Sequence, residues 1–324
     1  MRAAVYSDKG PAHEVLSVVE LPDPEPGPGE VRVRVSVSGV NPTDWKSRTS
    51  PAPMVGPVQI PNQDGAGVID AVGDGVDPVR VGERVWVFHA ARERVSGTAA
   101  TYSVVPADQA VSLPADVSFD QGAGLGIPFV TAHGCLFSDG AIAGRTVLIA
   151  GGAGAVGHAA IQLALRAGAT VITTVSSEAK ADIARTAGAV HIVNYRDADA
   201  AEQIRAIAPN GVDRIVELAL KTNLDLDLAV LAPHGVIVTY ATEVAGDPVI
   251  PVRSLMSPNI TLRFALVYNF TDRQISDAVA DISDALAQGQ LVAMPDHHFT
   301  LDQIADAHDA VEANAVGKVL VDIG

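Results

Sequence analysis

A glycine-rich turn is the residue pattern with the clearest chemistry in this chain. Gly152, Gly154 and Gly157 have the spacing Gly-x-Gly-x-x-Gly, directly after the apolar run 146–150 and before a helical pattern. Such a turn lets the backbone approach a pyrophosphate closely, and the helix after it directs free N–H groups and its positive dipole end at the same group. Glycine turns are common, but this one lies between a strand and a helix, which predicts a dinucleotide site.

The end of the next predicted strand carries polar residues that could select between nicotinamide dinucleotides. An NAD-selective site usually has Asp or Glu there, which binds the ribose 2′-hydroxyl. This chain has Ser176 and Ser177, with Lys180 one turn later and Tyr195 after the following strand. Two hydroxyls and a lysine suit a 2′-phosphate, so we expect NADPH rather than NADH. The alternative is a helix-capping serine beside a surface lysine.

The elements that must position these residues alternate regularly. From residue 146 to residue 240, apolar runs of strand length alternate with helical patterns, which predicts a parallel sheet covered on both faces. Before it, short valine-rich runs are separated by glycine and proline turns and suggest a partly open barrel. The predicted fold class is therefore α/β, with a second, β-rich domain. A last helix, a glycine turn and a strand end the chain.

Composition excludes several classes of function. The chain has 324 residues, which suggests about two domains, and 48% of them are hydrophobic, enough for a large core. Lys and Arg number 22 against 38 Asp and Glu, so the net charge of −16 argues against nucleic acid or an anionic membrane as partner. The single cysteine, Cys135, excludes an internal disulfide, and its apolar neighbours predict a buried thiol. Without a signal-peptide pattern, we expect a cytoplasmic enzyme.

Several motifs follow one another in a characteristic order. They are GVNPTDWKSR (39–48), DGAGVIDAVGDGV (64–76), VGERV (81–85), GLGIPFVTA (124–132) and the glycine turn. In this order the chain resembles the zinc-free medium-chain dehydrogenases/reductases, most closely the quinone oxidoreductases of the zeta-crystallin type. The resemblance covers essentially the whole chain. It implies a GroES-like barrel over residues 1–122 with 290–324, a doubly wound Rossmann domain over 123–289, and NADPH in the cleft.

The resemblance also assigns roles to individual residues. Those that would bind the pyrophosphate are Ala153, Gly154, Ala155 and Val156, and those that would hold the adenosine phosphate are Ser176, Lys180 and Tyr195. Those that would contact or line the nicotinamide side are Asn223, Tyr240, Ala241, Thr242 and Glu243, with the backbone of Phe264, Ala265 and Leu266. Asn41 and Thr131 would lie near the nicotinamide and the substrate. Lys318 could reach the cofactor from the tail, unless it is a surface lysine.

The resemblance makes zinc testable by residue type. Zinc-dependent members have a cysteine where this chain has Asn41 and a His-Glu pair where it has Gln63 and Asp64. Because zinc needs N, S or O ligands of defined geometry, we expect no metal site. Three histidines near the end of the chain lack the spacing of metal ligands, so we interpret them as surface or core residues. They are His297, His298 and His308.

One pocket position departs from the family pattern. Quinone oxidoreductases usually carry a tyrosine in NPxDxY, where this chain has Lys46 after Trp45. A lysine beside a developing enolate could stabilise its charge or donate a proton. A solvent-facing lysine is the alternative. The candidate catalytic residues are Asn41, Lys46 and Thr131.

The expected reaction is hydride transfer from NADPH to an electron-poor small molecule. A quinone is the expected acceptor, with an alkenal or enoyl reductase as the alternative that Lys46 favours. A third hypothesis is that the chain is a cofactor-binding protein with little turnover. The apolar segment 260–267 could form an edge strand, and the family resemblance suggests that two subunits pair there.

Overall fold

The computed structural model describes residues 1–242 and 246–324, and the chain divides into two compact units. Unit 1 consists of Met1–Ile127, Ser283–Gly289 and Ala293–Gly324, and unit 2 of Pro128–Ile282 and Gln290–Val292. Two helices run from one unit into the other, namely α4 (Gly126–Phe137) and α10 (Asp272–Ala287). Within the described ranges, no helix is both long and apolar enough to cross a membrane.

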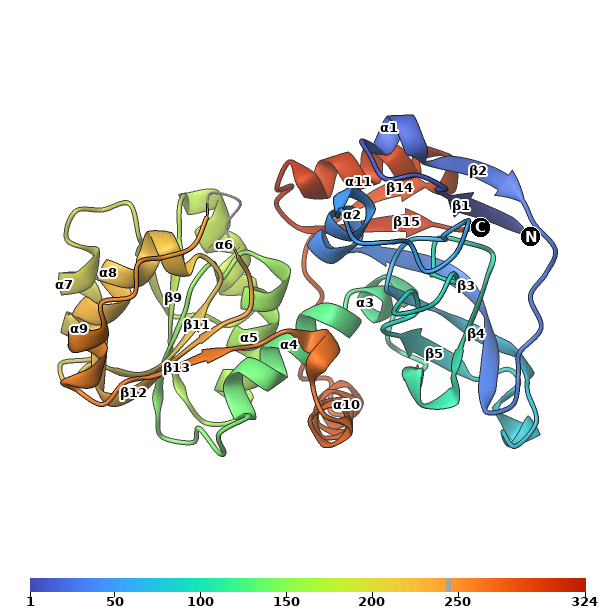
Figure 1. Cartoon of the computed structure of the whole chain (residues 1–324). Coiled ribbons are helices and arrows are strands. Elements are labelled where there is room, and N and C mark those ends of the chain that lie inside the picture. Colours follow the sequence, from blue (N-terminus) through green and yellow to red (C-terminus); the bar gives the residue numbers. More distant parts are fainter. Residues whose placement is uncertain (243–245) are drawn as a thin grey trace. The chain divides into compact units, whose positions relative to one another are not determined.

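Unit 2 is built on a six-stranded sheet in the order β10-β9-β8-β11-β12-β13, and every neighbouring pair is parallel. The strands are β8 (Thr146–Ile149), β9 (Thr170–Val175), β10 (His191–Asn194), β11 (Val212–Glu217), β12 (Leu231–Thr239) and β13 (Thr261–Phe264). The helices are α5 (Ala155–Arg166), α6 (Glu178–Thr186), α7 (Ala200–Ile207), α8 (Leu220–Val230) and α9 (Val252–Met256). Helices α5 and α6 lie against one face of the sheet and α7 and α8 against the other (Figure 1).

The central strands are largely buried because helices cover both faces. Leu148 of β8, Ile172 of β9 and Ile215 of β11 are all fully buried in one core cluster. The chain extends from β8 to β9 and β10 on one side and to β11, β12 and β13 on the other. This is the strand order of a Rossmann sheet, and it confirms the predicted doubly wound α/β fold.

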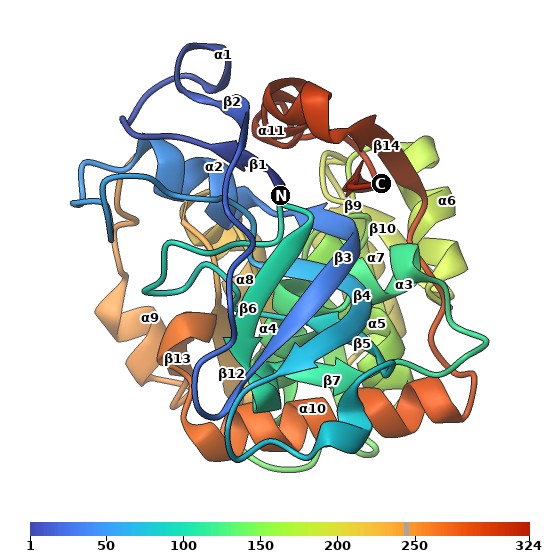
Figure 2. The ribbon, with the colours of Figure 1, turned by 90° about the vertical axis from the view of Figure 1, so that its right-hand side faces the viewer.

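Unit 1 is β-rich. Its main sheet has the order β14-β15-β3-β4-β5-β7, with β6 also paired to β3, and β1 and β2 form a separate ribbon. The strands are β1 (Arg2–Val5), β2 (Ser17–Glu20), β3 (Glu30–Val40), β4 (Asp64–Val72), β5 (Arg84–Val87), β6 (Tyr102–Pro106), β7 (Ala110–Ser112), β14 (Asp296–Thr300) and β15 (Lys318–Asp322). The helices are α1 (Ala12–Val15), α2 (Pro42–Thr49), α3 (Phe119–Ala123) and α11 (Ile304–Glu312). Figure 2 shows β3 between β4 and β6.

The long strand β3 positions the polar residues of unit 1. It pairs antiparallel with β4 on one side, and its last residues pair antiparallel with β15, with Val40 opposite Val319. Lys318 therefore lies beside the end of β3, although 277 positions separate it from Asn41. The chain leaves β3 at Asn41 and enters α2, which has proline in its first turn and Asp44 at its third position. Pro42 fixes the backbone for a helix start and Asp44 complements its positive end.

Three local features differ from, or agree with, the predictions from the sequence: helix α2, strand β13 and Cys135. Helix α2 was not expected from the sequence, because its polar residues carry no apolar period. The late strand is shorter than the predicted 260–267, since β13 ends at Phe264. Cys135 is a free, fully buried cysteine, as predicted, and burial raises the pKa of its thiol to about 12.

Candidate functional site

The residues expected to bind a dinucleotide gather at one edge of the parallel sheet in unit 2. The carboxyl ends of parallel strands meet at the same edge, which is where ligands bind in open α/β sheets. The glycine turn follows β8, Ser176 follows β9, Tyr195 follows β10, and Tyr240 follows β12. The fold thus brings together side chains that are widely separated in the sequence.

The three glycines of the turn have different reasons to be glycine. A Cβ at Gly157 would lie 2.3 Å from the carbonyl oxygen of Gly151, and a Cβ at Gly152 would lie 2.2 Å from Thr173 Oγ1. Glycine is therefore needed at both positions for the close packing of turn, helix and sheet. A Cβ at Gly154 would meet only the Gly151 oxygen, at 3.3 Å, and Gly154 is exposed at the N-cap of α5. Gly154 is therefore the least confined of the three glycines, and it lies at a helix end that attracts anions.

The next residues line the start of α5 and complete the turn. Ala153 is buried, while Ala155 and Val156 are half-buried in the first helical turn. The N–H groups of a first helical turn have no partner within the helix. The N–H groups of Ala155 and Val156 are the donors that a pyrophosphate would accept from, whereas the N–H of Gly154 already donates to Gly151 O at 2.9 Å. The residues at this helix start therefore fit a dinucleotide.

The ends of β9 and β10 form a polar corner. Ser177 is the N-cap of α6, and its hydroxyl accepts from the backbone N–H of Lys180 at 3.4 Å, so the helix-capping alternative holds for this serine. Ser176 is half-buried and has no such role. Tyr195 is bound to β9 through its backbone N–H, which donates to Val175 O at 3.1 Å.

Arg196 belongs to the same corner and was missed from the sequence. Its guanidinium lies 6.0 Å from the centre of the Tyr195 ring, and both side chains are exposed. An exposed cation beside Tyr195 adds to the positive charge of Lys180 at this end of the sheet. The signal that could have identified Arg196 was its place directly after a predicted strand end.

Asn223 is held by a buried acidic pair. Its side-chain amide donates to both carboxylate oxygens of Glu217, at 3.0 and 3.2 Å. Glu217 ends β11 and is fully buried, as is Asp227 of α8, whose carboxyl donates to Glu217. Burial, followed by the charge of Glu217, raises the pKa of Asp227 to about 9, so Asp227 keeps a proton at neutral pH that it can share with Glu217. The sequence analysis missed both carboxyl groups because nothing in their spacing relates them.

The remaining nicotinamide-side candidates offer mainly backbone. The N–H of Ala265 donates to Thr239 O at 2.9 Å, and Thr239 Oγ1 donates to Ala241 O at 3.2 Å. Tyr240 is half-buried and Thr242 is exposed, whereas Glu243 lies outside the described residues. The side chains of Phe264 and Leu266 are 73% and 54% exposed.

A second group of polar residues is buried in unit 1. The ammonium of Lys318 donates to Val40 O at 3.1 Å and to Asn41 Oδ1 at 2.8 Å. The Asn41 amide nitrogen in turn donates to Asp64 at 2.7 Å, and the Asn41 backbone N–H donates to Asp44 at 2.7 Å. Lys318 is only 5% exposed, so the expectation of a surface lysine is wrong. We refer to Asn41, Asp44, Asp64 and Lys318 as the Lys318 cluster.

Burial dominates the electrostatics of this cluster. It raises the pKa of Asp44 to about 8 and that of Asp64 to about 6, and it lowers the pKa of Lys318. The opposite charges counteract these shifts: Lys318 favours the ionised carboxyls, and both carboxyls favour the ammonium. The cluster thus combines one basic and two acidic groups, and burial shifts the pKa of each toward its uncharged form.

The other two catalytic candidates lie in different surroundings. Lys46 is exposed on α2, with its ammonium nitrogen 5.8 Å from the centre of the Trp45 ring. Thr131 is buried in α4 and belongs to unit 2, whereas Asn41 and Lys46 belong to unit 1. Within unit 1, Asn41 is therefore engaged by its neighbours and Lys46 faces solvent.

The residues at the positions where zinc-dependent members have their metal ligands do not fit a zinc ion. Asn41 and Asp64 bind each other, and Asn41 also accepts from Lys318. The Gln63 side chain accepts from the Ala91 backbone N–H at 3.1 Å. Amide and carboxylate oxygens around an ammonium lack the nitrogen and sulfur donors that zinc sites of this type use.

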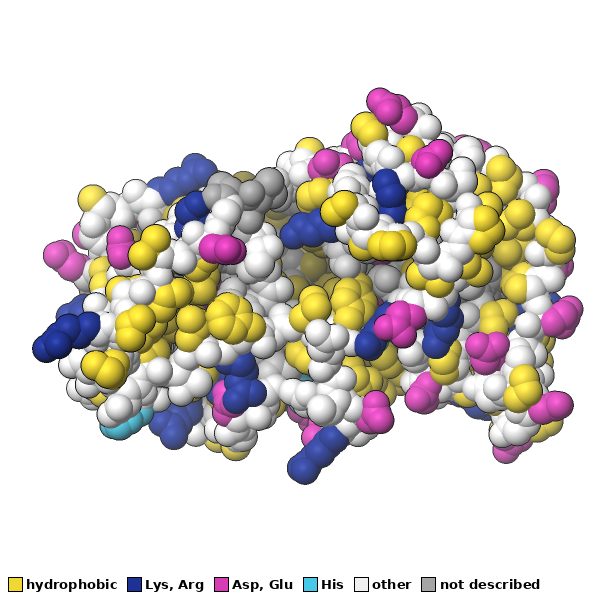
Figure 3. Space-filling model, viewed as in Figure 1, with side chains coloured by type: hydrophobic (Ala, Val, Ile, Leu, Met, Phe, Trp, Pro, Cys, Tyr) yellow, Lys and Arg dark blue, Asp and Glu magenta, His cyan; other side chains and the backbone are white. Residues whose placement is uncertain are grey.

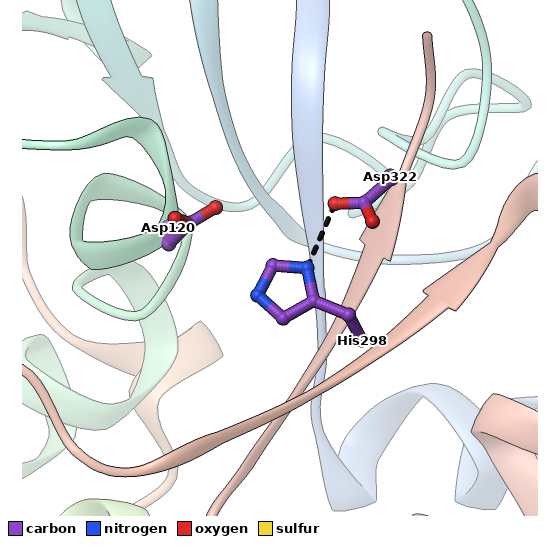
Figure 4. Close-up of side chains that lie close together, drawn as sticks. All are labelled: Asp120, His298 and Asp322. Atoms are coloured by element: carbon purple, nitrogen blue, oxygen red, sulfur yellow. Dashed lines mark hydrogen bonds and ion pairs between the residues drawn. The ribbon is translucent and has the colours of Figure 1, made fainter.

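An exposed group of histidine and aspartates lies elsewhere in unit 1 (Figure 4). Asp120 of α3, His298 of β14 and Asp322 of β15 have ligand atoms within 4.8 Å of one another, an arrangement that could hold a metal ion. His298 Nδ1 lies 2.8 Å from Asp322, and this hydrogen bond raises the pKa of the imidazole. The hydrogen bond between His298 and Asp322 already pairs these two exposed side chains, so we assign no metal ion to this group. His297 bonds to Val316 O, and His308 is buried against Asn62.

Two family models of known proteins match separate parts of the chain. Residues 27–115 match the family model described as the alcohol dehydrogenase GroES-like domain, and residues 155–284 match the model described as zinc-binding dehydrogenase. The quinone oxidoreductase of Rattus norvegicus is 30% identical over 265 residues, which cover 81% of this chain and 79% of the relative. The chain belongs to the quinone oxidoreductase family.

Solved structures agree with this assignment. A mycobacterial protein solved with NADPH has a TM-score of 0.86 and 29% identity, over 99% of this chain and 100% of that one. An NAD-dependent alcohol dehydrogenase has a TM-score of 0.90 and 27% identity, with both chains fully covered. The predicted membership in the zinc-free medium-chain reductases and the GroES-like second domain are confirmed, and the chain is an NAD(P)H-dependent oxidoreductase.

Proposed function

We propose that this quinone oxidoreductase family member reduces quinones with NADPH. The observation that carries the cofactor part is the carboxyl edge of the sheet in unit 2, where Gly154 is exposed at the N-terminus of α5. Relatives named quinone oxidoreductases, and the neighbour solved with NADPH, support the reaction.

The polar corner supports NADPH over NADH. Ser176 takes the place at which an acidic residue would repel a 2′-phosphate, and Lys180 and the newly found Arg196 supply positive charge. Tyr195 lies between the strand end and Arg196, with an exposed ring that could cover the adenosine phosphate. A dinucleotide with only a 2′-hydroxyl would leave these cations without a partner.

The nicotinamide cofactor, when bound, supplies the hydride. The protein's task is to bind and orient. The first turn of α5 holds the pyrophosphate, and Glu217 fixes the amide of Asn223 near the strand ends. In unit 2, the backbone at Tyr240–Thr242 and Phe264–Leu266, with Thr131, is proposed to contact the nicotinamide. Asn41 and Lys318 of unit 1 are proposed to act on the cofactor or the acceptor, as is Glu243, which lies outside the described residues. A reduced quinone is an oxyanion that water can protonate, so no side-chain acid is required.

A steady-state assay with several acceptors tests this proposal. We expect purified protein to consume NADPH, measured by the loss of reduced nicotinamide absorbance, when a small benzoquinone is added. Turnover with a 2-alkenal and none with quinones would favour the alkenal reductase, for which Lys46 in place of the family tyrosine is the specific observation. Tight NADPH binding without turnover on either acceptor would favour a cofactor-binding protein.

We also propose that two copies pair through β13. This strand is the edge of the six-stranded sheet, and it pairs only with β12 among the described strands. Exposed apolar side chains are carried by β13 and by the preceding helix α9, including Phe264, Val252 and Met256. Figure 3 shows apolar side chains gathered on the visible face of unit 2. An open apolar strand edge favours pairing with a second copy. Light scattering should give a dimer for the parent and a monomer for Phe264→Glu, and a monomeric parent would remove the proposal.

The partner expected at the active site is a small molecule, with neither nucleic acid nor membrane involved. A cytoplasmic setting fits the single buried cysteine, because reduced thiols persist there.

A further inference from the structure

The side chain of Asn223 is held by one carboxylate at the carboxyl end of β11. Its amide nitrogen donates to Glu217 Oε1 at 3.0 Å and to Glu217 Oε2 at 3.2 Å. Glu217 is fully buried, whereas Asn223 is half-buried near the start of α8. Within the described ranges no hydrogen bond uses the amide oxygen of Asn223, so this oxygen is left as an acceptor at a partly open position.

The surroundings of Glu217 determine which way this amide faces. Glu217 Oε1 also accepts from the backbone N–H groups of Leu218, at 2.7 Å, and of Ala219. An oxygen that accepts from two N–H groups has no hydrogen of its own to offer to a third partner. If the Asn223 amide were turned over, its oxygen would face an oxygen that only accepts, and the contact would be repulsive. The amide nitrogen therefore faces Glu217, and the amide oxygen faces away from it.

The strand order shows which half of a dinucleotide this oxygen can serve. Strands β9 and β10 lie on one side of β8 in the sheet, and β11 and β12 lie on the other. The polar corner proposed to hold the 2′-phosphate follows β9 and β10, and the glycine turn proposed to hold the pyrophosphate follows β8. The nicotinamide half therefore extends toward the ends of β11 and β12. Glu217 joins these two strand ends, since its carbonyl oxygen accepts from the N–H of Tyr240 at 3.1 Å.

We propose that Glu217 is a positioning residue for the cofactor: it binds the amide nitrogen of Asn223, so that the amide oxygen accepts from an N–H or O–H donor on the nicotinamide half of NADPH. That donor is the carboxamide group or a hydroxyl of the adjoining ribose. A reversed amide would present a second donor there and could not bind it. The inference rests on the proposed binding of NADPH and adds to it a role for Glu217, which acts only through Asn223.

Binding measured by calorimetry tests the role of Glu217 without turnover. Glu217→Gln keeps the shape of the side chain, but its new amide nitrogen favours a reversed Asn223 amide, so affinity for NADP⁺ should fall about fivefold to tenfold. Asn223→Leu removes the acceptor and should cause a similar loss. Both variants should bind 2′,5′-ADP, the fragment without the nicotinamide half, as the parent does. Asp225→Asn is the matched control, because it removes an exposed carboxylate from the same helix and should leave both affinities unchanged.

An acetylpyridine analogue of NADP⁺, which lacks the carboxamide nitrogen, identifies the donor. If the carboxamide donates, the parent should prefer NADP⁺ over the analogue, and both variants should lose this preference. If a ribose hydroxyl donates, both variants should lose affinity for NADP⁺ and for the analogue alike. Either result supports the proposal.

Two results would overturn the role of Glu217 while leaving the NADPH site intact. They are unchanged NADP⁺ affinity in a folded Glu217→Gln variant, and an equal loss of affinity for 2′,5′-ADP. A parent protein that binds no NADP⁺ would instead overturn the proposed NADPH site itself, and the role of Glu217 with it.

A measurement on the parent protein remains decisive if Glu217→Gln fails to fold. The side-chain NMR signals of Asn223, assigned by their loss in Asn223→Leu, should show amide hydrogens that exchange slowly with water before NADP⁺ is added. Addition of NADP⁺ should move the Asn223 Cγ signal downfield, because the amide oxygen gains a hydrogen bond, while the amide hydrogens stay protected. Amide hydrogens that exchange as fast as those of exposed asparagines, or a Cγ signal that bound NADP⁺ does not move, would contradict the proposal.

Discussion

The carboxyl edge of the sheet in unit 2 and the Lys318 cluster in unit 1 are both rich in polar groups but use them in opposite ways. At the sheet edge the polar groups are left open: Gly154 is exposed, and the side chains of Tyr195 and Arg196 extend into solvent. In the Lys318 cluster, each of Asn41, Asp44, Asp64 and Lys318 is buried and bonded to another member or to nearby backbone. Open polar groups leave room for a ligand, whereas mutually satisfied ones hold one another in fixed positions.

The largest effect is expected from breaking the closed cluster. Lys318→Met keeps the length of the side chain but removes its charge, which leaves buried carboxyl groups without their cation. We expect a loss of about 3–5 kcal/mol in the free energy of unfolding, measured by denaturant titration. Lys46→Met is the matched control: because Lys46 is exposed, that variant should stay within about 0.5 kcal/mol of the parent. Equal, small effects for both lysines would show that the cluster does not depend on charge.

The open turn should respond in binding rather than in stability. Gly154→Ala adds a methyl group whose one close contact is Gly151 O at 3.3 Å, so the free energy of unfolding should fall by only about 1 kcal/mol or less. The methyl group would obstruct a pyrophosphate, and we expect NADPH affinity, measured by calorimetry, to fall about tenfold or more. In contrast, Gly157→Ala should lower stability, because its Cβ would lie 2.3 Å from Gly151 O. Unchanged NADPH affinity in Gly154→Ala would exclude the turn as the binding site.

The polar corner should control the choice of cofactor. Ser176→Asp places a carboxylate where the 2′-phosphate is proposed to bind, so NADPH should weaken and NADH should gain. We expect the ratio of kcat/KM for NADPH over NADH to fall about tenfold, which corresponds to about 1.4 kcal/mol. Arg196→Gln should weaken NADPH alone, by a smaller factor. If neither variant changes the ratio, the phosphate lies elsewhere.

The smallest effect concerns pH. Asp227 has a folded-state pKa raised to about 9, so the stability it contributes is present at acidic pH and declines as pH rises from about 4 toward 9. Asp227→Asn cannot ionise and can still donate to Glu217. The parent should therefore lose stability gradually over this range, and the variant should lose less. Parallel pH profiles of thermal midpoint for the two proteins would argue against the shared proton.

The sequence predicts the carboxyl edge of the sheet in unit 2 much better than the Lys318 cluster. The glycine turn, the alternation of strands and helices and the polar end of β9 are local patterns, so each can be read within a few residues. Arg196 escaped notice because one exposed arginine after a strand has many ordinary explanations. The Lys318 cluster joins β3, β4, α2 and β15, and only strand pairing brings them together. A lysine near the end of the chain carries no local sign that it will be buried.

The same reasoning explains the acidic pair and the exposed histidine group. Glu217 and Asp227 are ten positions apart, and their contact depends on how α8 packs against β11. His298 meets Asp322 because β14 and β15 are parallel neighbours, and β14 itself has a largely exposed pattern that does not predict a strand. Contacts of this kind follow from tertiary structure, and spacing in the sequence does not reveal them.

A single-turnover experiment tests the central claim most directly. Protein in excess over NADPH is mixed rapidly with a benzoquinone, and the reduced nicotinamide and the hydroquinone are followed together. Our account predicts that all the bound NADPH is consumed and that one hydroquinone forms for each NADPH. NADPH that stays bound and unoxidised after the quinone is added would contradict it and would identify the open edge of the sheet as a binding site without hydride transfer to quinones.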